Sequence, residues 1–325
     1  MSRKSSSDHL AAIEIGGTKI QVVLGTPKGK IIENRRYAVN REKGATGIQE
    51  QILDGLKSLR KIKSFSAIGV GFGGPIDWKT GRVFKSHHIA GWDGFALGDW
   101  LRSEFGVKVV ADNDANVAAL AEAKLGAGRG KDPVYYMTVG SGIGGGIISG
   151  GRIYHGRPPG EVEIGHTRIP FQNLPPREWP ILETLCSGWS LDAQVRRAAE
   201  NHPGSILAKW IEPHGRGGEA RFLLEAKGHG DPHATRIWED LGRYLGLALS
   251  YVIQLFHPQI LVIGGGVSRF GEPLLEEIRR NLDLFVMAAH QGTYEVALAE
   301  LGEQAVPTGA LLLAASSPLS KIRII

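Results

Sequence analysis

Three short glycine-rich segments, each directly after an apolar run typical of a buried strand, could bind phosphate. They are Gly16-Gly17-Thr18-Lys19, Gly140 to Gly146, and Gly264-Gly265-Gly266. Glycine allows a positive φ and lets a phosphate approach bare N–H groups, and the hydroxyls of Thr18 and Ser141 add donors. Any one segment could be an ordinary tight turn. Three of them in one chain favour a nucleotide phosphate site.

Two common nucleotide-binding patterns do not account for these segments. Gly140 to Gly145 satisfies the Gly-x-Gly-x-x-Gly pattern, but that fingerprint requires a helix to follow, and residues 146–154 have the pattern of a β-hairpin. The P-loop spacing Gly-x4-Gly-Lys-Ser/Thr is absent. We therefore expect phosphates to be held between the turns of two β-hairpins.

A polar group, Asp112-Asn113-Asp114-Ala115-Asn116, stands between an expected strand and an Ala-rich expected helix. Asp and Asn are preferred helix N-caps, and capping explains one of these residues. Four polar residues in five positions leave others at the carboxyl end of a buried strand. An Asp there could accept the proton of a hydroxyl that attacks phosphorus. Capping and catalysis both stay open for this group.

A second polar group comprises Glu161, Glu163 and His166, with Glu183 further along the chain. The Glu-x-x-His spacing could hold a metal, but no second His stands at ligand spacing. Carboxylates and imidazole also suit vicinal sugar hydroxyls, which both donate and accept hydrogen bonds. We favour hydroxyl recognition over metal binding.

The elements that would position these groups show a repeat of strand, glycine turn, strand, turn, strand. Its two copies cover 11–39 (strands 11–15, 20–24 and 31–39) and 133–155 (strands 133–139, 147–149 and 152–155). Such a repeat predicts two related domains that face each other across a cleft. The other expected strands are 67–72, 107–111 and 260–263, and the expected helices are 97–105, 115–125, 188–200, 231–256, 272–284 and 308–315. We expect a linker at 126–130 and an irregular insert at 201–230, in an α/β architecture.

Composition excludes several classes of protein. The chain has 325 residues, 42% hydrophobic and 22% charged, which is typical of a globular protein with two domains. A single cysteine, Cys186, cannot form an internal disulfide, and this fits a reducing cytoplasm. No apolar run approaches a membrane span, and the polar start argues against a signal peptide. The net charge of +5 is spread out, so we expect neither a nucleic-acid nor a membrane partner.

With these motifs in this order, the chain resembles the ROK family (repressor, open reading frame, kinase) of the sugar kinase, Hsp70 and actin superfamily. The resemblance runs from Ala11 to Ala315. Its motifs are Glu14 to Lys19, Gly71 to Asp77, Gly91-Trp92-Asp93-Gly94, Asp112 to Asn116, Gly140 to Gly146, Glu163-Ile164-Gly165-His166, and Ile263 to Ser268.

The resemblance implies two ribonuclease-H-like (actin-like ATPase) domains that close on ATP and a hexose. We expect one lobe over 8–127, joined by a C-terminal helix at 308–325, and a second lobe over 128–307. The implied reaction is ATP-dependent phosphorylation of a hexose hydroxyl, most simply O6 of glucose. The family also implies a homodimer.

Roles are implied by the family's motif positions. Asp114 would be the catalytic base. Gly74 and Asn113 would contact the sugar. Hydroxyls of the sugar would be held by Glu163, His166 and Glu183. The residues implied along the nucleotide, with Mg²⁺ on its phosphates, are Glu14, Gly16, Gly17, Thr18, Lys19, Gly140, Ser141, Gly142, Gly265 and Gly266.

Three departures from the family pattern matter. The cysteine cluster of the family's zinc motif is missing, with Leu174, Pro176 and Ile181 at the aligned positions, so we expect no structural zinc. Glu14 stands where many members have Asp, so Mg²⁺ would be reached through water. His88 stands where Asn is common near the sugar, which leaves the preferred hexose open.

Other functions remain to be weighed. Repressors of the family carry a helix-turn-helix ahead of the first glycine turn, and about a dozen residues before Glu14 leave no room for one. A catalytically silent sugar-binding protein is a further alternative, against which the retained Asp114 and the three glycine turns argue. A kinase for another hexose or an N-acetylhexosamine is the nearest variant of the main hypothesis.

Overall fold

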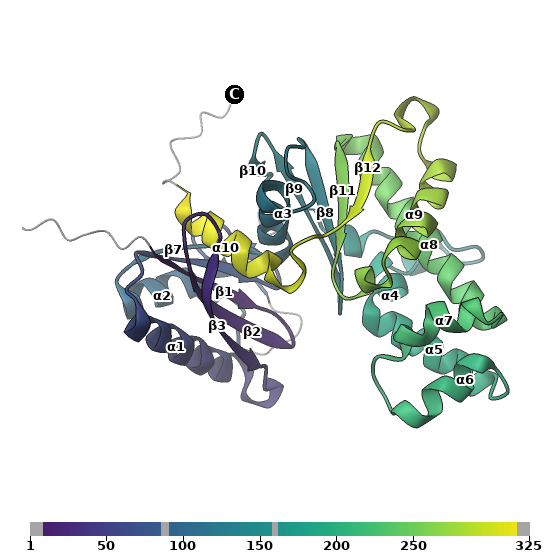
Figure 1. The fold of residues 1–325 in the computed structure, drawn as a ribbon, viewed down its shortest axis with the longest axis horizontal. Coiled ribbons are helices and arrows are strands. Elements are labelled where there is room, and N and C mark those ends of the chain that lie inside the picture. Colours follow the sequence, from purple (N-terminus) through teal and green to yellow (C-terminus); the bar gives the residue numbers. More distant parts are fainter. Residues whose placement is uncertain (1–8, 86–90, 158–161, 317–325) are drawn as a thin grey trace, which may run out of the picture. The chain divides into compact units, whose positions relative to one another are not determined.

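A computed structural model describes residues 9–85, 91–157 and 162–316 of the chain (Figure 1). The chain forms two compact units. Unit 1 comprises Met1–Leu125, Gly151–Glu161 and Glu303–Ile325, and unit 2 comprises Gly126–Gly150 and Val162–Gly302. The expected boundaries were 127 and 307, and the expected second lobe included residues 151–157, which are grouped with unit 1 here. Residue 8 and residues 317–325 of the expected first lobe lie outside the described ranges.

Unit 1 is built on a five-stranded mixed sheet in the order β3-β2-β1-β4-β7. These strands are β1 (Leu10–Ile15), β2 (Lys19–Gly25), β3 (Ile31–Ala38), β4 (Ala67–Phe72) and β7 (Lys108–Asn113). Strand β1 pairs antiparallel with β2 and parallel with β4, which pairs parallel with β7. Every residue of β1 and β4 is buried, as expected for central strands covered on both faces.

Helices cover both faces of this sheet, α1 (Gly44–Ile62) on one and α10 (Ala305–Ala315) on the other (Figure 1). Alternate residues of β1 point to opposite faces. Ile13 belongs to the core cluster of α1, whereas Ala12 belongs to that of α10. Helix α10 lies very close to the sheet, because a Cβ on Gly69 would come within 1.9 Å of the Ala310 carbonyl oxygen.

The remaining elements of unit 1 are short. They are β5 (Ile76–Asp77), β6 (Arg82–Val83), α2 (Leu97–Phe105), α3 (Asp114–Leu125) and the 3-10 helices Arg41–Lys43 and Gly302–Gln304, the latter beginning at the unit boundary. Strands β5 and β6 form a separate antiparallel pair.

Unit 2 repeats the arrangement with a sheet in the order β10-β9-β8-β11-β12. Its strands are β8 (Val134–Val139), β9 (Ile143–Ser149), β11 (Ile260–Gly264) and β12 (Glu295–Leu298). The two-residue edge strand β10 (Arg152–Ile153) pairs in this sheet, although it belongs to the segment that is grouped with unit 1. Strand β8 pairs antiparallel with β9 and parallel with β11, which pairs parallel with β12. The repeat predicted from the sequence is therefore present in the pairing pattern of both sheets.

Helices dominate the rest of unit 2. They are α4 (Leu182–Cys186), α5 (Gly188–Asn201), α6 (Ile206–Ile211), α7 (Leu223–Gly228), α8 (Pro232–Phe256), α9 (Glu272–Phe285) and the 3-10 helices Ile164–His166, Pro176–Glu178, Glu212–His214, Glu219–Phe222, Val267–Phe270 and Ala288–His290. Asp231 caps α8, since its Oδ1 accepts hydrogen bonds from the backbone N–H groups of His233 and Ala234. Its Oδ2 accepts from Leu207 and so ties α6 to α8.

Two expectations about local structure are wrong. The expected irregular insert at 201–230 contains α6 and α7, because Ser205 caps α6 and Leu207, Leu223 and Ala226 are buried. The glycine segment expected as one turn over 140–146 ends at Gly142, and Ile143 begins β9. Gly145 lies inside that strand where the Tyr135 hydroxyl would be 2.7 Å from a Cβ, so the glycine serves packing there.

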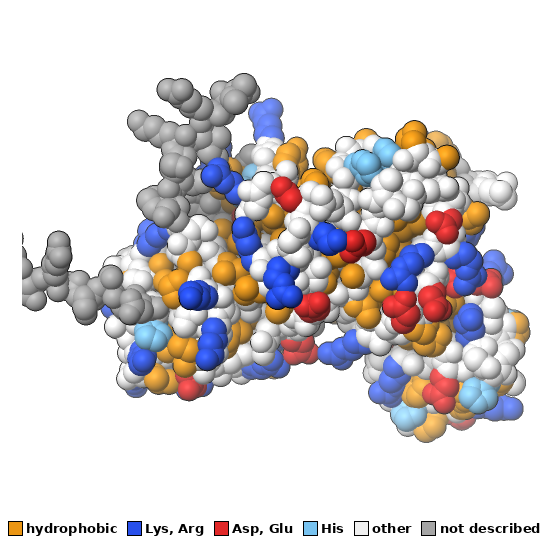
Figure 2. Space-filling model, turned by 45° about the horizontal axis from the view of Figure 1, so that its top comes forward, with side chains coloured by type: hydrophobic (Ala, Val, Ile, Leu, Met, Phe, Trp, Pro, Cys, Tyr) orange, Lys and Arg blue, Asp and Glu red, His pale blue; other side chains and the backbone are white. Residues whose placement is uncertain are grey.

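The surface agrees with the charge distribution expected from the sequence. On the face shown in Figure 2, basic side chains are interspersed with acidic and uncharged ones. None of the helices in the described part of the chain has the length and hydropathy that a membrane crossing requires.

Candidate active site

The junction between β7 and α3 carries the first polar group. Asn113 caps α3, since its Oδ1 accepts hydrogen bonds from the N–H groups of Ala115 at 2.9 Å and Asn116 at 3.3 Å. Its Nδ2 donates to the carbonyl oxygen of Gly74 at 3.3 Å. Asp114 begins the helix, and its Oδ1 accepts from the Ala115 N–H at 2.8 Å. Helix capping therefore accounts for the orientation of the Asn113 side chain. It does not account for the position of Asp114 Oδ2.

Gly73 is the place in unit 1 where three segments meet. Its N–H donates to the Ile15 carbonyl oxygen at 2.8 Å. A Cβ on Gly73 would lie 3.2 Å from Asp114 Oδ2 and 3.6 Å from the Cα of Gly16. The absence of a side chain at this position thus lets the Asp114 carboxylate lie beside the first glycine turn.

The first glycine turn joins β1 to β2 through Gly16, Gly17 and Thr18. The Gly16 N–H donates to the Lys19 carbonyl oxygen at 3.1 Å, and Thr18 is exposed. Neither Gly16 nor Gly17 has a positive φ. Glycine is therefore not required here for a left-handed backbone. A Cβ on Gly16 would lie 3.3 Å from the Lys19 carbonyl oxygen, so the close turn is one reason for glycine at that position.

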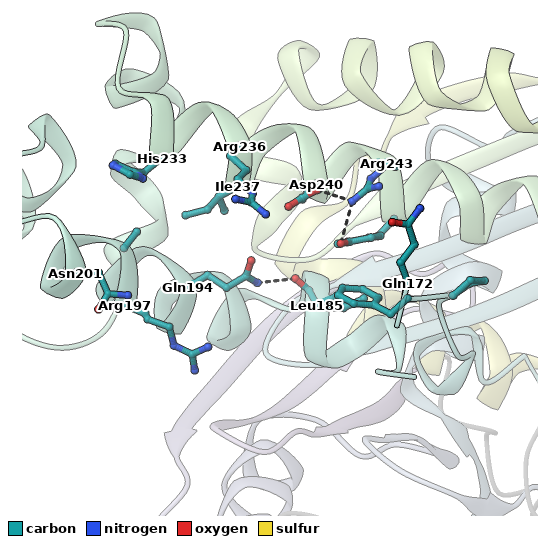
Figure 3. A pocket seen from close by; sticks show the side chains of 14 residues that line it. Gln172, Leu185, Gln194, Arg197, Asn201, His233, Arg236, Ile237, Asp240 and Arg243 are labelled. Atoms are coloured by element: carbon teal, nitrogen blue, oxygen red, sulfur yellow. Dashed lines mark hydrogen bonds and ion pairs between the residues drawn. The ribbon is translucent and has the colours of Figure 1, made fainter. Parts of the chain in front are cut away.

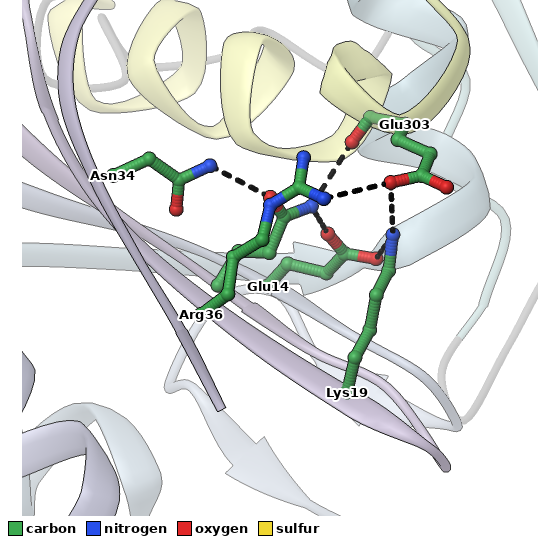
Figure 4. A network of polar contacts seen from close by, with 6 residues as sticks. Glu14, Lys19, Asn34, Arg36 and Glu303 are labelled. Carbon is green, nitrogen blue, oxygen red and sulfur yellow. Dashed lines mark hydrogen bonds and ion pairs between the residues drawn. The ribbon is translucent and has the colours of Figure 1, made fainter. Parts of the chain in front are cut away.

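Glu14 lies in a polar network beneath this turn (Figure 4). Its Oε2 accepts a hydrogen bond from Gln21 Nε2 at 2.5 Å, and Lys19 Nζ lies 3.6 Å from its Oε1. Glu303 continues the network, since its carbonyl oxygen accepts from Gln21 and its carboxylate pairs with Arg36 at 3.0 Å. Burial raises the pKa of Glu14, and the Lys19 charge and the Gln21 hydrogen bond offset this only in part.

The setting of Glu14 does not fit direct coordination of Mg²⁺. The carboxylate is 11% exposed, and its two oxygens face the Gln21 amide and the Lys19 ammonium. A divalent cation at Glu14 would be repelled by that ammonium and would have to lose waters that Mg²⁺ gives up reluctantly. Within the described ranges, no group of three His, Cys, Asp or Glu side chains is arranged to hold a metal.

The segment that replaces the family's zinc motif is held by ordinary contacts. Ile169 N–H donates to the Pro180 carbonyl oxygen at 2.9 Å, and Trp179 Nε1 donates to that of Leu174 at 3.0 Å. Arg168 and Ile181 form an isolated β-bridge. The positions aligned with the missing cysteines thus lie in a segment closed by backbone pairing.

In unit 2 the second and third glycine turns are neighbours, because β8 and β11 are adjacent and parallel. A Cβ on Gly140 would lie 4.0 Å from the backbone nitrogen of Gly266. Gly265 has a φ of 86°, and a Cβ there would come within 2.5 Å of the Val139 carbonyl group. Gly265 is thus required both for its backbone angle and for its close approach to β8.

Glu183 lies against the second glycine turn. Its Oε2 accepts a hydrogen bond from the Ile143 N–H at 2.8 Å, and a Cβ on Gly142 would lie 2.6 Å from that oxygen. Next along the chain, the Gly188 N–H donates to the Gly140 carbonyl oxygen at 2.7 Å. Glu183 is therefore not simply an exposed carboxylate at the start of a helix.

The Glu163-to-His166 motif reaches the same point of β9. A Cβ on Gly165 would lie 2.2 Å from the Ile143 carbonyl oxygen, so the motif packs directly on the strand. The Leu182 N–H donates to the Thr167 carbonyl oxygen at 2.9 Å, which brings the motif beside Glu183. The backbone of the Glu163-to-His166 motif and the Glu183 carboxylate thus both lie against Ile143 in unit 2.

The predicted site residues therefore fall into two groups. Unit 1 contributes Glu14, Gly16, Gly17, Thr18, Lys19, Gly74, Asn113 and Asp114, and unit 2 contributes Gly140, Ser141, Gly142, Glu163, His166, Glu183, Gly265 and Gly266. Glu161 and His88 lie outside the described residues.

Sequence reasoning missed Gln21, which holds the Glu14 carboxylate. Gln21 is fully buried and lies opposite Glu14 in the β1–β2 register. A polar residue within an apolar strand, directly across a hairpin from a buried carboxylate, was the pattern that could have revealed it.

A hollow of about 1010 Å³ in unit 2 lies away from these residues (Figure 3). It is lined by residues of α5 and α8, such as Gln194 and Arg236, together with Phe171 and Leu185. None of the predicted site residues is among those that line it. This hollow therefore does not identify the residues proposed for catalysis.

Comparison with known proteins places the chain in a family. The model of the ROK family matches residues 10–317. The chain belongs to the ROK family. It is 34% identical over 302 residues to a glucokinase of Halalkalibacterium halodurans, covering 90% of this chain and 91% of that protein. It is 31% identical over 260 residues to a beta-glucoside kinase of Listeria innocua, covering 80% of this chain and 83% of that protein.

A solved structure of the family is similar over nearly its whole length. It is a ROK family glucokinase from Streptomyces griseus in complex with glucose and AMPPNP. The identity is 31% and the TM-score 0.80, with 94% of this chain and 99% of that chain covered. The predicted fold class, α/β with actin-like ATPase domains, is confirmed by this similarity and by the two repeated sheets.

Proposed function

We propose that this ROK family member is an ATP-dependent glucokinase, which transfers the terminal phosphoryl group of ATP to O6 of glucose. The coarser statement, that the chain is an ATP-dependent hexose kinase, follows from its family and from its similarity to glucokinases over nine-tenths of its length. The observation that carries the phosphoryl-transfer role is the position of Asp114 Oδ2 beside Gly73 and the first glycine turn. The choice of glucose is supported by the similarity to glucokinases.

Asp114 is the general base of this proposal. Its Oδ1 is fixed by the Ala115 N–H, which orients the carboxylate so that Oδ2 is turned toward Gly73. An oriented carboxylate can take the proton of the sugar hydroxyl as that oxygen attacks phosphorus. Asn113, whose side chain is fixed by α3 and by Gly74, would hold a neighbouring hydroxyl.

The sugar would be recognised further by the group around Ile143. Glu163 and Glu183 offer acceptors, and His166 offers a donor and an acceptor in its neutral form. Glu183 is oriented for this by the Ile143 N–H, which fixes one of its oxygens. A site built to hydrogen-bond each hydroxyl discriminates strongly against sugars that lack or invert one.

The nucleotide would lie along the glycine turns. The turns Gly16 to Thr18 and Gly140 to Gly142 would border the phosphates, and Gly265 and Gly266 would border the nucleoside. The N–H groups of Gly16 and Gly140 already donate to the carbonyl oxygens of Lys19 and Gly142, so other N–H groups of these turns, such as that of Ser141, would face the phosphates. ATP would enter as its Mg²⁺ complex, with the metal on phosphates and water, since Glu14 does not fit as a direct ligand. Fixed donors aimed at the transferring group stabilise its charge without reorganisation.

The proposal extends to cellular setting and assembly. Cys186 is fully buried, and burial raises the pKa of its thiol, so this cysteine is unreactive and suits a reducing cytoplasm. A homodimer is proposed from the family, and light scattering coupled to gel filtration would give its mass.

A substrate panel tests the function. Purified protein is supplied with Mg²⁺, ATP and one of glucose, mannose, fructose, N-acetylglucosamine or N-acetylmannosamine, and ADP release is measured by a coupled assay. We expect the highest kcat/KM with glucose and a product phosphorylated at O6. A different preferred sugar would overturn the glucose assignment alone, whereas no ADP release with any sugar would indicate a silent sugar-binding protein.

A further inference from the structure

Asp112 is a buried carboxylate that braces the turn before the proposed base. The residue is 2% exposed. Its Oδ1 accepts hydrogen bonds from the Asn113 N–H at 2.8 Å and from Asn116 Nδ2 at 3.0 Å. These two bonds tie the last residues of β7 to the first turn of α3 and enclose Asp114. The direction in which Asp114 projects therefore depends on where the Asp112 carboxylate is held.

His155 holds the other oxygen of that carboxylate. Its Nε2 lies 2.6 Å from Asp112 Oδ2. An ionised carboxylate only accepts hydrogen bonds, so Nε2 carries the proton and donates it. The imidazole stacks on Trp78, with ring centroids 4.1 Å apart and an angle of 14° between the planes. Its distance and angle toward Asp112 are thus fixed by a second contact.

His155 comes from a different part of the chain than Asn113 and Asn116, the other two residues that bond to Asp112. It lies in the described segment 151–157, which follows β9 of unit 2, is grouped with unit 1 and precedes the Glu163-to-His166 motif in the chain. Trp78 directly follows β5, and β5 follows the Gly73-Gly74 turn. The imidazole therefore joins the strand-to-helix turn to the segment after Gly74 on one side and to the segment before Glu163 on the other.

We propose that His155 is a positioning residue for phosphoryl transfer, which acts through Asp112 to set the orientation of Asp114 and Asn113. The inference rests on the proposed kinase function and extends it to a residue with no direct role in the reaction. Loss of the Nε2–H donor leaves a buried carboxylate oxygen without its partner, and a buried oxygen in that state rotates or admits water. A displacement of about 1 Å at a catalytic group costs about 10²-fold in rate.

Paired variants separate the hydrogen bond from the ring. His155→Phe keeps a ring to stack on Trp78 and loses the donor, whereas His155→Gln keeps a side-chain N–H donor and loses the ring. We expect His155→Phe to lower kcat with glucose by about 10- to 100-fold and to leave the KM for ATP within about twofold. His155→Gln should recover most of that loss. Arg152→Gln, at an exposed residue of the same segment, is the matched control.

Two further measurements decide whether the effect passes through the base. In an Asp114→Asn background, His155→Phe should cause no additional fall in kcat, because residues that act through one group are non-additive. Hydrogen exchange should become faster at the Asn113 to Asn116 amides in His155→Phe and stay unchanged over β1 and β2.

The outcomes separate this inference from the proposed function. Unchanged kcat and unchanged exchange in His155→Phe would overturn the positioning role while leaving the kinase assignment intact. Multiplicative losses in the double variant would overturn it as well. Absence of turnover in the unaltered protein would end the kinase assignment, and the exchange measurement would still decide whether His155 holds the turn.

Discussion

The sheets of the two units share one pairing pattern but end in different chemistry. In unit 1, β7 leads into Asn113 and Asp114, so a carboxylate stands at the carboxyl end of the sheet. In unit 2 the corresponding edge strand β12 ends at Leu298, and glycine turns follow β8 and β11 just as they follow β1 and β4 in unit 1. One scaffold used twice thus carries glycine turns in both copies and the proposed proton acceptor at the end of the edge strand of unit 1.

The units differ also in the segment inserted after the third strand. In unit 1 the helix between β3 and β4 is α1, which covers the sheet. In unit 2 the corresponding interval holds Glu163, His166 and the helices α4 to α8. The insertion adds Glu163, His166 and Glu183, the groups proposed to bind sugar hydroxyls. These three residues therefore come from a different part of the chain than Asp114 and Asn113, the proposed base and its neighbouring sugar contact.

The largest expected effect tests the acidic end of unit 1. Asp114→Asn should lower kcat with glucose by about 10²–10⁴-fold, because the amide cannot accept the hydroxyl proton. Glucose affinity, measured by calorimetry, should change little. Asp99→Asn, at an exposed carboxylate of α2, is the control. A kcat within about twofold of the unaltered protein would remove Asp114 from this role.

The glycine end of unit 2 is tested by a pair of adjacent residues. Gly265→Ala should lower the free energy of unfolding by about 1–3 kcal/mol, since the side chain meets the Val139 backbone at a positive φ. It should also raise the KM for ATP. Gly266→Ala has no atom within 4 Å of its Cβ, so its free energy of unfolding in urea should stay near that of the unaltered protein. Equal effects of the two substitutions on stability would contradict the geometry.

The glycine turns and the contact between His155 and Asp112 differ in how far the sequence could predict them. Glycine after an apolar run marks the turns around Gly140 and Gly265 because such a residue has few other reasons to end a strand. The bond between His155 and Asp112 joins residues 43 positions apart, and no local pattern predicts such a contact. It depends on the passage of the chain back into unit 1 at 151–157.

Helix α1 and the segment 201–230 show why some elements were not predicted. The buried residues of α1, among them Ile48, Ile52 and Leu59, have helical spacing, but the helix begins with Gly44 and has no side-chain cap. Glycine and proline across 201–230 indicated irregular structure, whereas Ser205 caps a helix within that segment and Asp231 caps the next one. In this segment the helix caps determined the local structure, whereas the glycine and proline content had predicted irregular structure.

A smaller effect should separate recognition from catalysis. Glu183→Gln keeps an oxygen for the Ile143 N–H but removes the charge that strengthens bonds to sugar hydroxyls. We expect kcat/KM for glucose to fall by about tenfold or more, with the KM for ATP unchanged. Glu178→Gln, at an exposed carboxylate nearby in the chain, is the control. A rise in the KM for ATP alone would assign Glu183 to the nucleotide instead.

The smallest effect compares the buried carboxylates Glu14 and Asp231 through the pH dependence of stability. Burial raises the pKa of Glu14 above 4.5, so the folded state retains its proton longer and loses stability as pH rises through that raised value. Burial alone would raise the pKa of Asp231 too, but hydrogen bonds from Leu207, Ala234 and His233 hold it below 3.8. Its contribution is complete above pH 3.8 and is lost as pH falls through the lowered value.

Urea unfolding between about pH 3 and 7 checks both directions. Relative to the unaltered protein, Glu14→Gln should gain stability as pH rises above about 4.5, whereas Asp231→Asn should show a deficit near pH 7 that shrinks below about pH 4. Glu50→Gln, at an exposed residue of α1, should show neither trend. If the stability change of both variants, relative to the unaltered protein, depended on pH in the same direction, the opposite pKa shifts of Glu14 and Asp231 would be contradicted.

The position of α10 has a consequence for the order in which the protein matures during translation. Ala310, Leu311 and Ala314 complete the core that Leu10 and Ala12 begin, so roughly three hundred residues separate the first and last members of one apolar layer. While the ribosome is still making unit 2, one face of the N-terminal sheet has no helix α10 to shield it from water. The segment synthesised first is thus among the last to become fully native, and it is during this interval that a nascent chain of this design most needs protection from aggregation.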